Sequence, residues 1–410
     1  MARLASVSLV SVILVVAAGA SESVNPTVLT SFGVNLNGGS NIYGGVILDA
    51  RGDLYGATAD GGAHGSGVVY RLSGSGGSWT ETVLYSFRGG LLDGANPHAS
   101  LTWDGQQTLY GTTIAGGLNH NCTGGCGVVF SLVPISRGQW METVIYRFTG
   151  GADGSVPYAG LTMDSSGNLY GATSTGGSSG FGVVYKLSYS PTSGWAQTVL
   201  HSFSGSADGA TPFSAPILDQ AGNLYGVTYY GGPGNFGTVY QISPVGDSWK
   251  ERILYAFEGA SDGANPAASL VFDQAGNLYG TTVLGGSASV GTAFELNAAG
   301  AWTKTVLHNF LGLSSQDGAN PNGLIFDSAG NLWGTTVAGG LYNPGTIFEL
   351  VPQPGGVWQE TVDYSFTGGN DGAYPSAGLV LDPFGRFYGT TLWGGLAGHT
   401  VGGVAFEIVP

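Results

Sequence analysis

Hydrophobic and polar residues alternate along short segments of the chain, and these segments recur in one order. A unit runs from TVLYSF through a loop that contains Asp-Gly, and then through segments such as AGLVLD, GNLYGTT and GTIFEL. Alternation with a period of two, together with many Val, Tyr, Phe and Thr residues, is typical of β-strands. Gly-Asn, Gly-Gly and Asp-Gly pairs between the segments favour tight turns. Each unit therefore predicts four antiparallel strands.

The unit recurs at intervals of about 55 residues along the chain. Its copies begin at Thr27, Thr82, Thr143, Thr198, Arg252, Thr305 and Thr361. Seven four-stranded units predict an all-β fold, a seven-bladed β-propeller of antiparallel blades over residues 27–410. A β-solenoid is the alternative, although its coils are usually shorter.

The two ends of the repeat region complement each other. The chain enters with a lone fourth strand near residues 27–32 and finishes with the first three strands of a unit. We therefore expect the N-terminal strand to pair with the last blade, which removes the open edges of a linear array. A Trp precedes the fourth strand in the other six units, at Trp79, Trp140, Trp195, Trp249, Trp302 and Trp358.

With GNLYGTT, GTIFEL and TVLYSF followed by a DGA-x-P loop, the repeat resembles the GloVer tandem repeat of bacterial exported proteins. The resemblance covers residues 27–410. It implies a propeller-like extracellular protein and no particular activity.

Residues 1–20 match a secretory signal peptide, with Arg3 before an apolar stretch and Ala18-Gly19-Ala20 at the cleavage site. Residues 21–26 then form a short linker. An uncleaved membrane anchor is the alternative. We expect a secreted protein, whether extracellular, periplasmic or on the cell surface, with no membrane span after cleavage.

The composition and net charge limit the classes of partner that we expect the protein to bind. The chain has 75 Gly, only 9% charged residues and 42% hydrophobic residues, which suits a packed core with many turns. The net charge of -15 disfavours nucleic acid and anionic membranes. We expect a monomer.

Cys122 and Cys126 are the two cysteines, and we expect them to form a local disulfide, with a weak metal site as the alternative.

Repeated carboxylates are predicted to be turn residues. One Asp closes the first strand of each unit: Asp49, Asp104, Asp164, Asp219, Asp273, Asp327 and Asp382. A second set precedes Gly in the loop after the fourth strand: Asp93, Asp153, Asp208, Asp262, Asp317 and Asp371. Turn carboxylates accept backbone N–H groups, and a calcium ring would need more oxygens for each ion. We predict no catalytic residue, no metal and no cofactor.

Aromatic residues at equivalent positions, such as Tyr55 and Phe87, are predicted to pack between blades. His201 and His308 replace a Tyr of the fourth strand and are predicted to be structural.

Positions where the repeats disagree are the candidate site. Before the turn Asp of the first strand, the units carry Tyr43, His98, Tyr158 and Phe213, and then smaller residues. His64, His120 and His399 fall in loops between the second and third strands, on the face conventionally used for ligands. These seven residues predict an aromatic, weakly charged site for a sugar or another neutral polar ligand.

Three functions remain open. The first is a non-enzymatic exported propeller that binds a carbohydrate or a protein through its loop face. The second is a secreted polysaccharide-active enzyme, a lyase or glycosidase. The third is a purely structural cell-surface or matrix protein.

Overall fold

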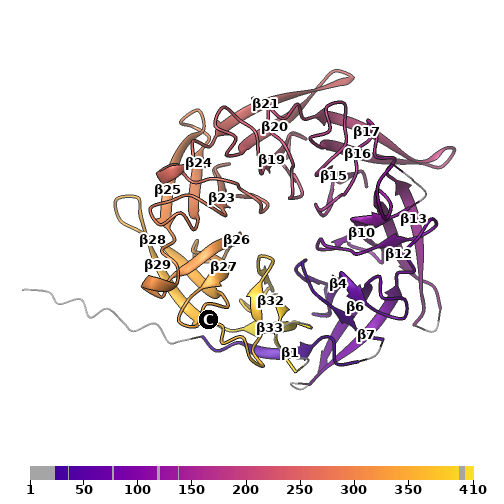
Figure 1. Ribbon diagram of the computed structural model, residues 1–410, viewed down its shortest axis with the longest axis horizontal. Coiled ribbons are helices and arrows are strands. Elements are labelled where there is room, and N and C mark those ends of the chain that lie inside the picture. Colours follow the sequence, from indigo (N-terminus) through magenta and orange to yellow (C-terminus); the bar gives the residue numbers. More distant parts are fainter. Residues whose placement is uncertain (1–23, 36, 76–77, 118–120, 137, 397–401) are drawn as a thin grey trace, which may run out of the picture.

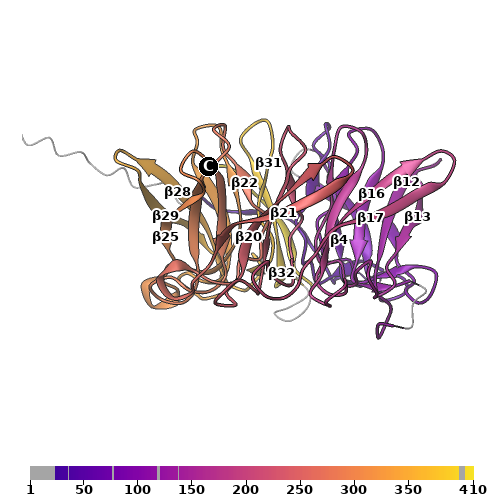
Figure 2. The same cartoon turned by 90° about the horizontal axis from the view of Figure 1, so that it is seen from above.

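Seven four-stranded antiparallel sheets surround a central axis in the computed structural model (Figure 1), as the repeat predicts. The structure describes residues 24–410 except 36, 76–77, 118–120, 137 and 397–401, so the predicted signal peptide at 1–20 lies outside it. Seen edge-on, the propeller carries its connecting loops on two opposite faces (Figure 2). Its described part contains two short 3-10 helices, η1 (Ala260–Asp262) and η2 (Leu313–Ser315). None of its helices has the length and apolar character to cross a bilayer.

The blades are numbered from the N-terminus, and their strands are given from the axis outward. Blades 1 and 2 contain β3 (Ile47–Leu48), β4 (Leu54–Thr58), β6 (Val68–Ser75) and β7 (Ser78–Ser86), then β9 (Thr102–Trp103), β10 (Leu109–Thr113), β12 (Val128–Pro134) and β13 (Trp140–Arg147). Blades 3 and 4 contain β14 (Thr162–Met163), β15 (Leu169–Thr173), β16 (Val183–Ser190) and β17 (Gly194–Ser202), then β18 (Ile217–Leu218), β19 (Leu224–Thr228), β20 (Thr238–Val245) and β21 (Ser248–Ala256). Blades 5 and 6 contain β22 (Val271–Phe272), β23 (Leu278–Thr282), β24 (Thr292–Asn297) and β25 (Thr303–Asn309), then β26 (Gly318–Phe326), β27 (Leu332–Gly339), β28 (Thr346–Gln353) and β29 (Val357–Ser365).

Blade 7 joins the two ends of the repeat region. It consists of β30 (Ala373–Pro375) and β31 (Val380–Leu381), which both pair with β32 (Phe387–Trp393), followed by β33 (Val404–Ile408) and β1 (Thr27–Ser31). Strand β1 runs antiparallel to β33, with Val28 opposite Phe406. The predicted closure by the N-terminal strand is confirmed.

Outside blade 6, the innermost strands are shorter than the sequence pattern predicts, with two residues each in β3, β9, β14, β18, β22 and β31. In blade 1 only Ile47 and Leu48 pair with β4. The residues before them lie against the neighbouring blade: a Cβ on Gly44 would stand 2.5 Å from the backbone of Ala99, and the N–H of Gly45 donates to Ser100 Oγ at 2.9 Å. The inner segments thus bond to each other across blades, which draws them away from their own sheets.

Large buried side chains fill the space between adjacent blades. Tyr55 of blade 1 packs with Leu101 and Phe130 of blade 2, and the rings of Phe87 and Phe130 lie 5.0 Å apart. The predicted role of these repeated aromatics as inter-blade core is confirmed.

The turn between the first two strands is built as predicted. In DQAGNLYG, residues 219–226, Asp219 Oδ1 accepts the N–H groups of Ala221 and Asn223 at 2.9 and 2.8 Å. Its Oδ2 accepts the Tyr225 hydroxyl at 3.1 Å. Burial alone would raise the pKa of Asp219, but the bonds from Asn223, Tyr225 and Ala221 outweigh it and hold the pKa below its usual value. The Asp of this repeated turn therefore has a structural role.

Candidate functional site

Each blade enters the axis region through one backbone turn. A residue with a left-handed φ starts the turn, and a proline follows it in six blades; these residues are Asn41, Asn96, Val156, Thr211, Asn265, Asn320 and Tyr374. Their N–H groups donate to the preceding blade, as Val156 does to the Cys126 carbonyl at 2.9 Å and Thr211 to the Phe181 carbonyl at 2.8 Å. The turn therefore fixes where the next side chains of the inner segment lie.

The residue two positions after this turn lines a cavity of about 600 Å³ at the propeller axis. Its residues in blades 1 to 4 are Tyr43, His98, Tyr158 and Phe213. In blades 5 to 7 they are Ala267, Asn322 and Ser376. We call this cavity the channel mouth. One of its sides is aromatic, and the other carries small or polar side chains.

The four predicted rings form one continuous arc. Tyr43 stacks on His98 with centroids 4.1 Å apart and planes inclined by 8°. Tyr158 meets His98 edge-on at 5.2 Å, and Phe213 meets Tyr158 edge-on at 5.4 Å. Contacts of this kind hold each ring against its neighbour. The structure thus brings together the four aromatic residues that the repeat differences indicate.

Two tyrosines that the sequence analysis missed extend the arc in blade 4. Tyr229 contacts Phe213 at 5.2 Å, and Tyr230 contacts Tyr229 at 4.7 Å. They follow the strand segment YGVT, where blade 1 has Ala59 and Asp60. The same signal, a break in the repeat, could have found them.

Among the described residues, no Asp, Glu, Lys or Arg lines the channel mouth. Burial lowers the pKa of His98 to about 4, although nearby Asp60 opposes that shift. Asp60 is held by the Asn41 amide at 2.7 Å. His98 is therefore a neutral ring at neutral pH, suited to stacking and hydrogen bonding.

Of the other predicted site histidines, the described His64 does not join this group. His64 is exposed and does not line the cavity. His120 and His399 lie outside the described residues. His201 and His308 bond to Asp208 and Asp317 at 3.2 and 3.1 Å, as Tyr85 bonds to Asp93 at 2.9 Å.

Cys122 and Cys126 form a disulfide, as predicted. It packs against Gly150, where a Cβ would meet both sulfur atoms at 2.8 Å. The carbonyl of Cys126 accepts the N–H of Val156, two residues before Tyr158. The disulfide thus supports the aromatic side of the mouth.

Replacing Val156 with Asn is expected to stabilise the protein by about 1 kcal/mol, because a β-branched residue is strained at the φ of 56° found there. In the equivalent turns, the amides of Asn96 and Asn265 also donate to carbonyls of the preceding blade, each at 2.9 Å. Urea unfolding measures the change. The reciprocal variant Asn265→Val should lose a similar amount, and a less stable Val156→Asn protein would contradict the strain.

Sequence comparison identifies the repeat. The model of the Gloeobacter/Verrucomicrobia repeat matches residues 18–238 and again residues 213–410. A search of curated proteins finds no significant match.

Several solved structures share the fold at low identity. A protein from Lactobacillus plantarum is 16% identical with a TM-score of 0.54, covering 83% of this chain and 88% of its own. A proposed 6-phosphogluconolactonase from Bacteroides uniformis is 15% identical with a TM-score of 0.53, covering 82% and 88%. An ancestral GH74 enzyme is 12% identical with a TM-score of 0.57, covering 94% of this chain and 51% of its own. At such identities the likeness establishes the propeller fold alone.

Proposed function

This chain belongs to the Gloeobacter/Verrucomicrobia repeat family, and we propose that its channel mouth binds a neutral polyhydroxylated ligand, a carbohydrate, without chemical turnover. The observation that carries the proposal is the arc of Tyr43, His98, Tyr158 and Phe213 on one side of a cavity whose described lining residues carry no charge. Pockets that hold small molecules combine apolar and aromatic walls with a few polar groups.

The two sides of the mouth suit the two kinds of surface on a sugar. The C–H face of a pyranose is apolar and packs on an aromatic face, whereas its hydroxyl rim needs hydrogen-bond partners. Tyr43 is 37% exposed and offers a ring together with a hydroxyl. Asn322 and Ser376 supply polar atoms on the opposite side.

We favour binding over catalysis because sugar hydrolysis needs two carboxyl groups in different environments. The described lining contains no carboxyl group, and His98 is a weak base in its buried position. A polysaccharide-active or lactonase-type enzyme is the competing class, given the enzymes that share the fold.

We further propose that the protein is exported. The signal-like segment 1–20 supports export, and so does the Cys122–Cys126 disulfide, since disulfides persist in oxidising compartments. Mass spectrometry of protein recovered outside the cytoplasm should give a chain that begins at Ser21. A mature chain that still carries residues 1–20 would contradict this.

Tyr158→Ala and Phe213→Ala are each expected to weaken carbohydrate binding at least ten-fold, because each removes a stacking surface worth about 1.4 kcal/mol or more. A glycan array selects the ligand, and calorimetry then gives its dissociation constant. Phe384→Ala is the matched control, since Phe384 is 83% exposed and lies away from the cavity.

Two outcomes would overturn the proposal: binding that survives the Tyr158→Ala, Phe213→Ala double change, or no glycan retained by the unaltered protein. Release of new reducing ends or of an opened lactone would instead establish the enzyme class.

A further inference from the structure

A recurring contact links the fourth strand of a blade to the loop that follows it. Tyr85, Tyr146, Tyr255 and Tyr364 donate a hydroxyl to the loop Asp, at 2.9, 3.0, 2.7 and 2.9 Å. His201 and His308 take the place of this Tyr in blades 3 and 5. At both histidines the fourth strand of the next blade brings a Glu toward the same Asp, namely Glu251 and Glu360.

The group in blades 5 and 6 has the spacing of a metal site. One ligand atom from each of His308, Asp317 and Glu360 lies within 4.8 Å of the other two. His308 Nε2 stands 3.1 Å from Asp317 Oδ2, with 18% and 8% of the two side chains exposed. The N–H of Leu311 donates to Asp317 Oδ2 at 2.7 Å and so fixes the carboxylate. Such outer hydrogen bonds orient ligands in known sites.

Glu360 is the member that lacks a partner. Its Oε1 is buried and accepts no hydrogen bond in the described structure. A buried carboxyl group without a partner is costly. A cation between the three side chains would neutralise it and complete its contacts.

We propose that His308, Asp317 and Glu360 bind one divalent transition-metal ion of the zinc class, which ties blade 5 to blade 6. An imidazole nitrogen with two carboxylate oxygens is a donor set that zinc accepts, and water can complete the tetrahedron. The ligands come from β25, from the loop before β26 and from β29, so the ion would cross-link two blades.

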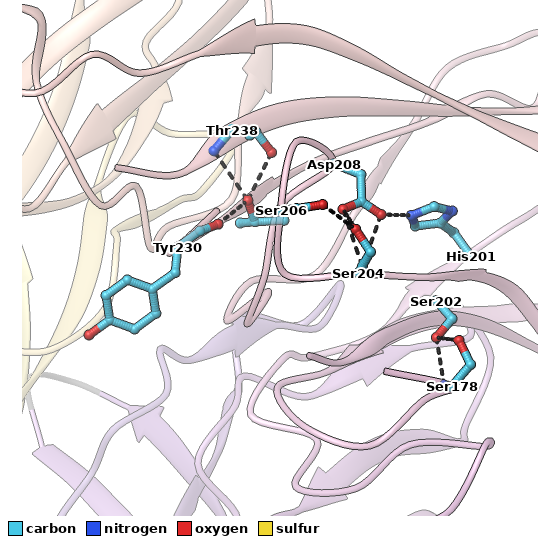
Figure 3. Close-up of polar contacts among 9 residues, drawn as sticks. Ser178, His201, Ser202, Ser204, Ser206, Asp208, Tyr230 and Thr238 are labelled. Carbon is cyan, nitrogen blue, oxygen red and sulfur yellow. Dashed lines mark hydrogen bonds and ion pairs between the residues drawn. The ribbon is translucent and has the colours of Figure 1, made fainter. Parts of the chain in front are cut away.

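The equivalent group in blades 3 and 4, formed by His201, Asp208 and Glu251, serves as an internal control. There Asp208 accepts the backbone N–H of Ser204 at 3.0 Å, the Ser204 hydroxyl and a bond from His201 Nε2 (Figure 3). Among the described residues, His201, Asp208 and Glu251 do not reach the close spacing of the first group. We therefore expect one metal ion per chain at His308.

Calorimetric titration of the metal-free protein with ZnCl₂ tests the proposal, together with the melting temperature measured with and without Zn²⁺. The expected result is one site per chain that raises the melting temperature. His308→Tyr installs the residue that four other blades carry, and Glu360→Gln installs the equivalent of Gln197; both should weaken binding at least 100-fold.

His201→Tyr should leave the affinity unchanged, and circular dichroism checks the fold of each variant. No zinc binding by the unaltered protein would overturn the proposal. Binding that His308→Tyr and Glu360→Gln leave unchanged, as exposed histidines such as His64 would give, would overturn it equally.

Discussion

Raising the pH from 5 to 8 is expected to lower the melting temperature of the metal-free protein by about ten degrees. Four acidic side chains carry the effect. Burial raises the pKa of Glu142, Glu251 and Asp363 to about 7 and that of Glu360 to about 8, and neighbouring carboxylates add to it. These groups keep their protons in the folded state at pH values where the unfolded chain has lost them.

The sign follows from this difference in bound protons. Stability from a group with a raised pKa is complete below its unfolded value and is lost as the pH rises through the folded value. At about 1.4 kcal/mol per pKa unit, the four groups together remove on the order of several kcal/mol. His98 acts in the opposite direction, because its pKa is lowered to about 4, and its contribution is complete above the unfolded value near 6.5.

The repeat itself supplies the control variants for the pH effect. Gln stands at position 197, equivalent to the three Glu residues, and Leu84 is equivalent to Asp363. The combined variant Glu142→Gln, Glu251→Gln, Glu360→Gln, Asp363→Leu should melt at nearly the same temperature at pH 5 and pH 8. Differential scanning calorimetry in EDTA measures both proteins. An equally steep pH dependence in the variant would contradict the assignment.

Gly182→Ala is expected to destabilise the protein by more than about 3 kcal/mol. Its φ is 95°, and a Cβ would stand 2.2 Å from the Thr173 carbonyl oxygen and 2.9 Å from Pro212 Cδ. Both neighbours belong to rigid backbone or ring, so β15 of the same blade and the turn of the next blade would both have to shift. Since Pro212 precedes Phe213, the arc at the channel mouth should be disturbed as well.

Gly180→Ala is the matched control in the same loop. Its φ is 85°, but an added Cβ would meet nothing within 4 Å. Only the left-handed backbone is strained there, at about 1 kcal/mol. Urea unfolding, followed by intrinsic fluorescence, compares the stabilities of the two variants. Equal losses at both positions would show that backbone strain, rather than the clash with Thr173 and Pro212, sets the requirement for Gly182.

Repetition is what makes the fold predictable from the sequence. Seven copies average out local ambiguity, so blade number, strand order and the inter-blade role of residues such as Tyr55 follow from the pattern. The arc at Tyr43, His98, Tyr158 and Phe213 follows from the places where copies differ. Its role in binding stays a prediction.

Other features depend on how neighbouring blades meet, which alternation along one strand does not reveal. Glu142, Glu251 and Glu360 look like solvent-facing polar residues of the fourth strand, yet each is partly buried and near enough to the loop Asp of the preceding blade for that charge to raise its pKa. For the same reason, the sequence pattern does not reveal that His308, Asp317 and Glu360 lie together. The short inner strands also reflect crowding at the axis, where Gly44 approaches Ala99.

The pairing of β1 with β33 also sets the order of events during synthesis. Thr27 is among the first residues of the described chain to be made, and its partner Glu407 is among the last. Blades 1 to 6 can form as the chain grows, but the seventh waits until residues 404–408 have been made. A polypeptide that stalls before residue 404 would leave β1 unpaired and the propeller open at one edge, a template for association with other chains.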